Sequence, residues 1–261
     1  MRVMIMHKVN ESTEAGVLPG PEVLAGMGRL TQEMVQAGVF LDAAGLQPSS
    51  TRVRLNFSRG ERRVTRGPLT GRNELIAGFA LMKVGSMEEA IEWATRFAQV
   101  VGDVEIDVGP VTEPWDLGVA PKPAGVVPLR VLAMHKADES SEAFAAPSPE
   151  MMAEMGKLIE EMTKAGVLLA TEGLKPSSEG WRLRYSGGKR AVIDGPFAES
   201  KELIAGYVML RVKSREEILD WAGRFANVVG DVEMDVRPLF EESDLAPAEA
   251  HGQAATEGRP A

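Results

Sequence analysis

The chain has 261 residues, of which 44% are hydrophobic and 26% are charged, a composition typical of globular domains with real hydrophobic cores. The 29 Lys and Arg residues against 38 Asp and Glu residues give a formal net charge of −9, which repels phosphate backbones and argues against nucleic-acid binding. The absence of cysteine excludes disulfides and thiolate chemistry, and it suits a reducing compartment.

No segment of the sequence has the pattern of an export signal or a membrane span. The first residues lack the long apolar stretch of a signal peptide, and no run of about 18 apolar residues occurs. We therefore expect a cytoplasmic protein that does not interact with a membrane.

The chain is a tandem duplication, because residue n of the first half matches residue n+128 of the second half without a gap. Met6–Lys8 matches Met134–Lys136, for example, and Val100–Glu105 matches Val228–Glu233. Units of this size indicate duplicated domains, since solenoid repeats have about 20 to 50 residues. We expect a first module over residues 1–118, a linker over 119–128, a second module over 129–245 and a disordered tail over 246–261, which holds the third histidine, His251.

Each module begins with a short apolar strand over residues 2–8 or 130–136. Apolar residues at helical spacing then predict a helix that Gly38 or Gly166 ends. Residues 53–57 alternate apolar and polar side chains, as a strand with one polar face does, and a hairpin turn follows.

The second half of each module starts with a nearly continuous apolar run over residues 75–84 or 203–212, which predicts a central strand. Ser86 and Glu89 form a capping box that opens a helix, and residues 103–108 alternate strictly as a last strand. The order is strand, helix, strand, hairpin, strand, helix, strand, which predicts an α+β, ferredoxin-like module with both helices on one sheet face.

Such a module leaves the other face of its sheet apolar and uncovered. Two modules in one chain can bury these faces against each other, so we expect an intramolecular pseudo-dimeric α/β barrel with clefts at its ends or rims. This internal pairing is compatible with a monomeric protein.

The second copy contains the run Asp194-Gly195-Pro196-Phe197, followed by residues 198–207 in a matching pattern. In this respect the chain resembles the YCII-related superfamily, in the branch named for the Asp-Gly-Pro-Phe motif. The first copy departs from the motif at Arg66 and Leu69, yet it keeps a family-like loop after Glu14 that the second copy has altered. The resemblance implies a ferredoxin-like fold paired into a dimeric α/β barrel.

The same resemblance does not imply a single activity. Members of the wider superfamily resemble small lyases or dehydrochlorinases built around a His-Asp pair. Members of the branch are often encoded beside extracytoplasmic-function sigma factors, which makes such a factor a candidate partner by family association only.

The candidate catalytic residues are His135, Asp194 and His7. The two histidines end the first strand of each module, and a histidine beside a carboxylate can act as a general base. Asp194 is the natural partner, but its counterpart is Arg66, so one such pair at most can form. The alternatives are histidines bonded locally at a strand end and an aspartate that only sets a turn before Gly-Pro.

Other charged residues are candidates for binding a ligand. Lys8 and Lys136 follow the histidines, Arg54 and Arg182 share a strand face, and an internal ion pair with Glu74 or Glu202 is the alternative for these arginines. No metal-ligand spacing and no phosphate-binding glycine loop occurs, so we predict neither a metal nor a cofactor. The ligand-binding candidates are Lys8, Lys136, Glu14, Arg54, Arg182 and Glu202.

Two functions remain open at this stage, and the sequence leaves undecided whether the protein is an enzyme. In the first, a cleft formed by both modules binds or transforms a small molecule, with acid-base chemistry by a His-Asp pair as one mechanism. In the second, the protein is a non-enzymatic regulatory or interaction module. Because the copies have diverged in complementary places, we expect two unequal clefts.

Overall fold

The computed structural model describes residues 1–72, 74–197 and 201–244. The tail predicted over residues 246–261, including His251, lies outside these described residues. Among the described helices, none is long and apolar enough to cross a membrane.

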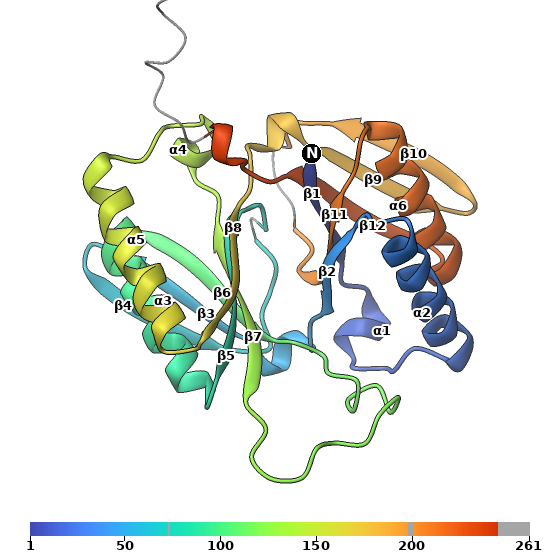
Figure 1. Ribbon diagram of the computed structural model, residues 1–261, viewed down its shortest axis with the longest axis horizontal. Helices are drawn as coiled ribbons and strands as arrows, with labels where there is room; N and C mark the ends of the chain where they lie inside the picture. The colour runs from blue at the N-terminus through green and yellow to red at the C-terminus, as the bar shows by residue number, and fades with distance from the viewer. Residues whose placement is uncertain (73, 198–200, 245–261) are drawn as a thin grey trace, which may run out of the picture.

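The two repeats form the same elements in the same order (Figure 1). The first repeat contains β1 (Arg2–Lys8), α1 (Glu11–Glu14), α2 (Pro21–Gln36), β2 (Phe40–Gly45), β3 (Val53–Ser58), β4 (Glu61–Arg66), β5 (Ile76–Val84), α3 (Met87–Val101) and β6 (Val104–Pro110). The second repeat contains β7 (Leu129–Lys136), α4 (Glu139–Glu142), α5 (Pro149–Lys164), β8 (Leu168–Gly173), β9 (Trp181–Ser186), β10 (Lys189–Asp194), β11 (Ile204–Arg211), α6 (Arg215–Val229) and β12 (Val232–Pro238). Half of the predicted capping box is present, because the Ser86 side chain accepts from Glu89 N, whereas the Glu89 carboxylate accepts from Gly85 N.

The strands form two six-stranded antiparallel sheets, and each sheet takes strands from both repeats. We call them the first sheet, with the order β10-β9-β12-β1-β11-β2, and the second sheet, with the order β4-β3-β6-β7-β5-β8. In the first sheet Met4 of β1 lies opposite Met209 on one side and Arg237 on the other. Each repeat therefore contributes its first two strands to the sheet of the other repeat.

This exchange means that each compact ferredoxin-like unit is a composite. In the first sheet, the central strands β12-β1-β11-β2 have the ferredoxin-like order, with β1 and β2 from the first repeat and β11 and β12 from the second. The hairpin of β9 and β10 extends the sheet on one side. The strands β2 and β8 are absent from the element order that the sequence predicts. None of their residues is buried in the structure, so neither strand has the apolar pattern on which the prediction relies.

Helices cover the outer face of each sheet, and the inner faces pack against each other (Figure 1). Helices α2 and α6 lie on the first sheet, and α3 and α5 lie on the second. The inter-sheet core includes Met4 and Tyr207 from the first sheet and Phe79 and Met134 from the second, and the rings of Phe79 and Tyr207 are 5.9 Å apart. The predicted α+β fold of two ferredoxin-like units packed sheet to sheet is confirmed, with each unit built from strands and helices of both repeats.

Candidate functional site

Two clusters of buried charged side chains lie on the inter-sheet faces, at equivalent positions of the two halves. We call the first the Lys136 cluster, which consists of Arg54, Glu74, Asp107 and Lys136. We call the second the Lys8 cluster, which consists of Lys8, Arg182 and Asp235. Strand exchange builds both of them, because the lysine of each cluster belongs to one repeat and its partners to the other.

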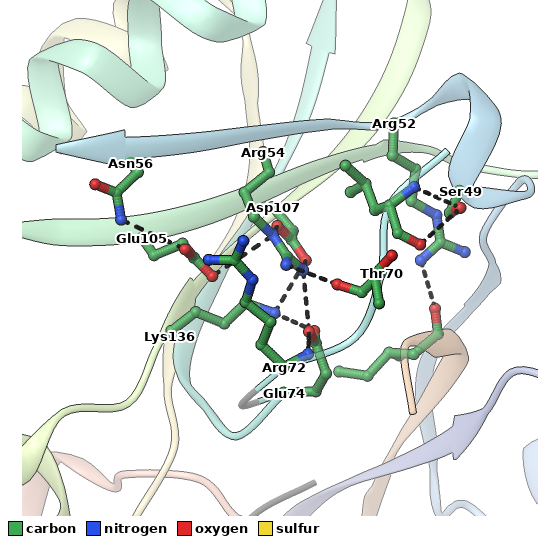
Figure 2. Close-up of polar contacts among 12 residues, drawn as sticks. Ser49, Arg52, Arg54, Asn56, Thr70, Arg72, Glu74, Glu105, Asp107 and Lys136 are labelled. Atoms are coloured by element: carbon green, nitrogen blue, oxygen red, sulfur yellow. Dashed lines mark hydrogen bonds and ion pairs between the residues drawn. The ribbon is translucent and has the colours of Figure 1, made fainter. Parts of the chain in front are cut away.

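The Lys136 cluster is a closed network of two cations and two carboxylates (Figure 2). Arg54 on β3 donates from Nε and Nη2 to both carboxylate oxygens of Asp107 on β6, at 2.6 and 2.7 Å. Its Nη2 also donates to Glu74 Oε1 at 2.9 Å, and Lys136 on β7 donates to Glu74 and, at 2.9 Å, to Asp107. The loop before β5 holds Glu74 in place, because Arg72 N donates to Glu74 Oε1 at 3.0 Å.

The electrostatics of this network favour the ionised forms of Arg54 and Asp107. Hydrogen bonds to Asp107 raise the pKa of Arg54. Burial alone would raise the pKa of Asp107, but Arg54 and Lys136 outweigh burial and lower it. Both carboxylates are 2% exposed, so this charge balance is what allows the group to stay buried.

The Lys8 cluster repeats the arginine-aspartate contact but differs at the lysine. Arg182 on β9 donates from Nε to Asp235 Oδ1 at 2.7 Å and from Nη2 to Asp235 Oδ2 at 3.2 Å. The guanidinium of Arg182 also lies 4.7 Å from the centre of the Phe197 ring, so the Asp-Gly-Pro-Phe segment covers this cluster. Lys8 Nζ lies 2.7 Å from Asp235 Oδ2, within ion-pair distance.

Lys8 is poorly satisfied for a buried ammonium group. The residue is 5% exposed, and its Nζ has no hydrogen-bond acceptor in good geometry among the described residues, although Asp235 is close enough to form an ion pair. Burial lowers the pKa of Lys8, and the charge of Arg182 lowers it further, against the opposing effect of Asp235. Burial likewise acts to raise the pKa of Asp235, but Lys8 and Arg182 outweigh it and lower that pKa.

The two clusters differ most at one pair of equivalent residues, Glu74 and Glu202. Glu74 is 2% exposed and lies between Arg54 and Lys136, whereas Glu202 is exposed and forms no ion pair within the described part of the chain. Among the described residues, the Lys8 cluster therefore lacks the second carboxylate that contacts both the arginine and the lysine in the Lys136 cluster. The glutamates Glu105 and Glu233 do not change this difference, because each lies near its arginine Nε at 3.5 or 3.6 Å.

Sequence reasoning identified the basic members of both clusters but not Asp107 or Asp235. Both aspartates stand in strictly alternating last strands, at the position that faces away from the helices. That alternation could have identified both aspartates, because it places them on a buried sheet face, where a carboxylate needs a charged or hydrogen-bonding partner. The candidate Glu14 belongs to neither cluster. Its carboxylate accepts a hydrogen bond from the Ser49 hydroxyl and another from Ser49 N, at 3.3 Å.

The two histidines lie on the opposite, helix-facing side of the sheets. The His7 ring packs 5.4 Å from Phe225 of α6, and the His135 ring packs 5.0 Å from Phe97 of α3. Burial lowers the pKa of each histidine to about 4, and Lys8 adds to this effect at His7. Both side chains are therefore neutral near pH 7.

The structure does not bring Asp194 to either histidine. Asp194 ends β10 in the first sheet, where its exposed carboxylate pairs with Arg215, and His135 belongs to the second sheet. His7 shares the first sheet with Asp194, but β9 and β12 separate their strands. The carboxylate whose charge acts on His135 is Asp138, which caps α4.

Comparison with known proteins agrees with the repeat. The model of the YCII-related domain matches the chain twice, over residues 1–106 and 129–239. The uncharacterized protein R00369 of Rhizobium meliloti (strain 1021) is 33% identical over 113 residues, which make up 41% of this chain and 91% of that protein. No solved structure matches the chain. The chain therefore belongs to the YCII-related domain family, and it carries two tandem copies of the domain.

Proposed function

We propose that the protein binds a small molecule with a carboxylate group at the Lys8 cluster, between its two sheets. The observation that carries this proposal is the different position of Glu74 and Glu202. In the Lys136 cluster the Glu74 carboxylate is bonded by both Arg54 and Lys136. In the Lys8 cluster the equivalent Glu202 is exposed, so a ligand carboxylate can make the contacts that Glu74 makes in the other half.

The charge of the cluster supports the same conclusion. Buried cations need carboxylate partners, and among the described residues Lys8 has Asp235 alone within ion-pair distance, a carboxylate that it shares with Arg182. One guanidinium can serve two carboxylates, as Arg54 does with Asp107 and Glu74, so Arg182 can contact a ligand carboxylate while it keeps Asp235. Its side chain is 14% exposed, against 3% for Lys8 and for Asp235, so the ligand would approach from the side of Arg182.

In this proposal the Lys136 cluster is the equivalent site that does not bind a ligand. Glu74 acts there as a built-in carboxylate, and the network is complete without a ligand. One binding site in each chain is therefore expected, in the first sheet.

Calorimetric titration of the intact chain with sodium acetate tests the proposal. We expect one acetate site, and we expect the variant Lys8→Met to lose it. The control is Lys189→Met, which changes the net charge of the protein by the same amount but removes an exposed lysine from the hairpin of β9 and β10. Binding at saturating acetate should also raise the free energy of unfolding, by about 2.7 kcal/mol at 100 times the Kd.

Two outcomes would contradict the proposal. One is the absence of any acetate binding to the unmodified chain, by calorimetry and by thermal denaturation. The other is binding that Lys8→Met leaves intact while Lys189→Met removes it, because that result would assign the effect to the surface.

A further inference from the structure

We infer that each repeat of this chain binds the unlike repeat in preference to a second copy of itself. We call a first repeat with a second repeat an unlike pair, and two copies of one repeat a like pair. The interaction surface is the inter-sheet core together with the loops before β5 and β11, where the two repeats meet. The partner that this surface fits is the other repeat, and the inference does not rest on the proposed ligand.

The first support is a polar contact between the repeats in which both residues have diverged. Tyr207 Oη of the second repeat donates to Asp42 Oδ2 of the first repeat at 2.6 Å. Tyr207 is 3% exposed, and burial together with the Asp42 contact raises the pKa of its hydroxyl, which therefore stays a donor. The counterparts of these residues are Phe79 and Ala170, which are both apolar and both pack in the inter-sheet core.

Neither like pair can form this hydrogen bond. In a pair of first repeats, Asp42 would face Phe79, which has no polar hydrogen to donate. In a pair of second repeats, the buried Tyr207 hydroxyl would face Ala170 and lose its acceptor, which costs free energy. Two unlike pairs therefore contain two such bonds, and the two like pairs made from the same repeats contain none.

The second support is a close approach between the loops before β5 and β11. A Cβ on Gly71 of the first repeat would lie 1.7 Å from Lys201 O of the second repeat, so a side chain at this position cannot fit against the carbonyl. The counterpart of Gly71 is Glu199. A pair of second repeats would bring a glutamate to this contact, and the two loops would have to move apart.

Unlike pairing also decides which charged clusters the molecule contains. The arginine and the aspartate of the Lys136 cluster come from the first repeat, whereas those of the Lys8 cluster come from the second. A like pair would hold two clusters of one kind. The preference of the surface for the other repeat therefore gives every molecule one cluster of each kind.

A cut in the linker tests the inference and leaves the contacts between the repeats unchanged. A protease recognition sequence is inserted after Pro121, in the exposed segment 120–126, and the folded chain is cut there. Unlabelled and isotopically labelled proteins are cut, mixed, held at the urea denaturation midpoint and returned to buffer, and native mass spectrometry identifies the pairs. Unlike pairs that combine both labels show that the fragments have exchanged.

Chance assortment would make half of the pairs unlike. A hydrogen bond to a charged group changes an equilibrium constant by about tenfold or more, so we expect about nine in ten pairs to be unlike.

The matched variant removes the polar contact by copying each repeat onto the other. Asp42→Ala introduces the residue found at position 170, and Tyr207→Phe introduces the residue found at position 79. In the chain with both changes, the share of unlike pairs should fall toward half. The control Lys83→Arg copies Arg211 in the same way at an exposed position, and it should leave the share of unlike pairs unchanged.

Three outcomes would overturn the inference. The first is a share of unlike pairs near half for the chain with natural repeats, and the second is an equal share for that chain and the double variant. The third is a return of single fragments alone, because the surfaces then do not recognise each other without the peptide link. None of these outcomes bears on acetate binding by the intact chain, so the proposed function stands or falls separately.

Discussion

Arg52, which directly precedes β3, and Arg237 on β12 make the same contact in the two halves, although they are not equivalent residues of the repeat. Arg52 Nε donates to Gln47 O at 2.8 Å, and Arg237 Nε donates to Lys175 O at 2.9 Å. These two acceptors are equivalent in the repeat, whereas the two arginines are not, since Arg52 precedes β3 and Arg237 belongs to β12.

A glycine lies against each of these arginines, Gly109 on β6 against Arg52 and Gly180, just before β9, against Arg237. A Cβ on Gly109 would lie 3.2 Å from Arg52 Cδ, and a Cβ on Gly180 would lie 2.8 Å from Arg237 Cδ. Gly180 is the repeat equivalent of Arg52, and Gly109 is the equivalent of Arg237. Each repeat therefore has one arginine and one glycine at this pair of positions. The arginine is the first of the pair in the first repeat and the second of the pair in the second repeat.

This relationship predicts that the arginine of the first repeat can be moved from position 52 to position 109. Arg52→Gly should lower the free energy of unfolding by about 3 kcal/mol, because buried carbonyl oxygens lose a charged donor. Gly109→Arg alone should also lower the free energy of unfolding, since the Arg52 side chain already fills the space beside Gly109. The double variant should recover most of the loss, as measured by urea denaturation.

The control for this experiment is Arg63→Gly, which puts a glycine into an exposed strand position of β4. It measures the backbone cost of glycine in a strand without the loss of a buried guanidinium. A double variant that is as unstable as the two single changes added together would refute the relationship.

Glu74→Gln should destabilise the protein much more than Glu202→Gln. The first change removes the carboxylate that contacts both Arg54 and Lys136, and breaking a buried ion network costs about 3 to 5 kcal/mol. The second change affects an exposed side chain and should leave the denaturation midpoint almost unchanged. Equal effects in urea denaturation would contradict the proposed difference between the clusters.

The stability of the fold should fall between pH 6.5 and pH 4 because of its two histidines. Burial lowers the folded-state pKa of His7 and of His135 from 6.5 to about 4, so the unfolded chain takes up protons first. The stabilisation is present above pH 6.5 and is lost as the pH falls to about 4, at up to about 3 kcal/mol per histidine. Asp107 and Asp235 have lowered pKa values and act below this window, under about pH 3.8.

Urea denaturation across this pH range, on the parent chain and on His135→Gln, checks the prediction. Glutamine has no charge at any pH, so the variant should show a flatter dependence on pH even where its stability at pH 7 is reduced. An unchanged slope would mean that His135 does not titrate as expected.

Within the Asp-Gly-Pro-Phe segment, the glycine should matter far more to the fold than the aspartate. A Cβ on Gly195 would lie 1.7 Å from the carbonyl oxygen of Ser177, so Gly195→Ala forces a backbone shift and should cost about 3 kcal/mol or more. The Asp194 side chain is 70% exposed and pairs only with Arg215 among the described residues. Asp194→Asn should leave the thermal denaturation midpoint nearly unchanged, and a large loss there would contradict a surface role.

The sequence by itself determined the duplication, the family and most elements of each repeat except β2 and β8, because local periodicity and capping residues depend on neighbouring positions. The helix beginning at Met87, for example, follows from Ser86 and Glu89 alone. The basic members of both clusters were also visible as polar residues on otherwise apolar strands.

Only the tertiary structure decided which repeat each strand joins. Pairing of β1 with β11 and β12 satisfies the same backbone hydrogen bonds that pairing within one repeat would satisfy, so the pattern along the chain is the same in both cases. The same limit applies to Glu74 and Glu202, which are identical residues in matching sequence. Their different burial depends on how each loop packs in the assembled fold, and that packing makes the two halves chemically unequal.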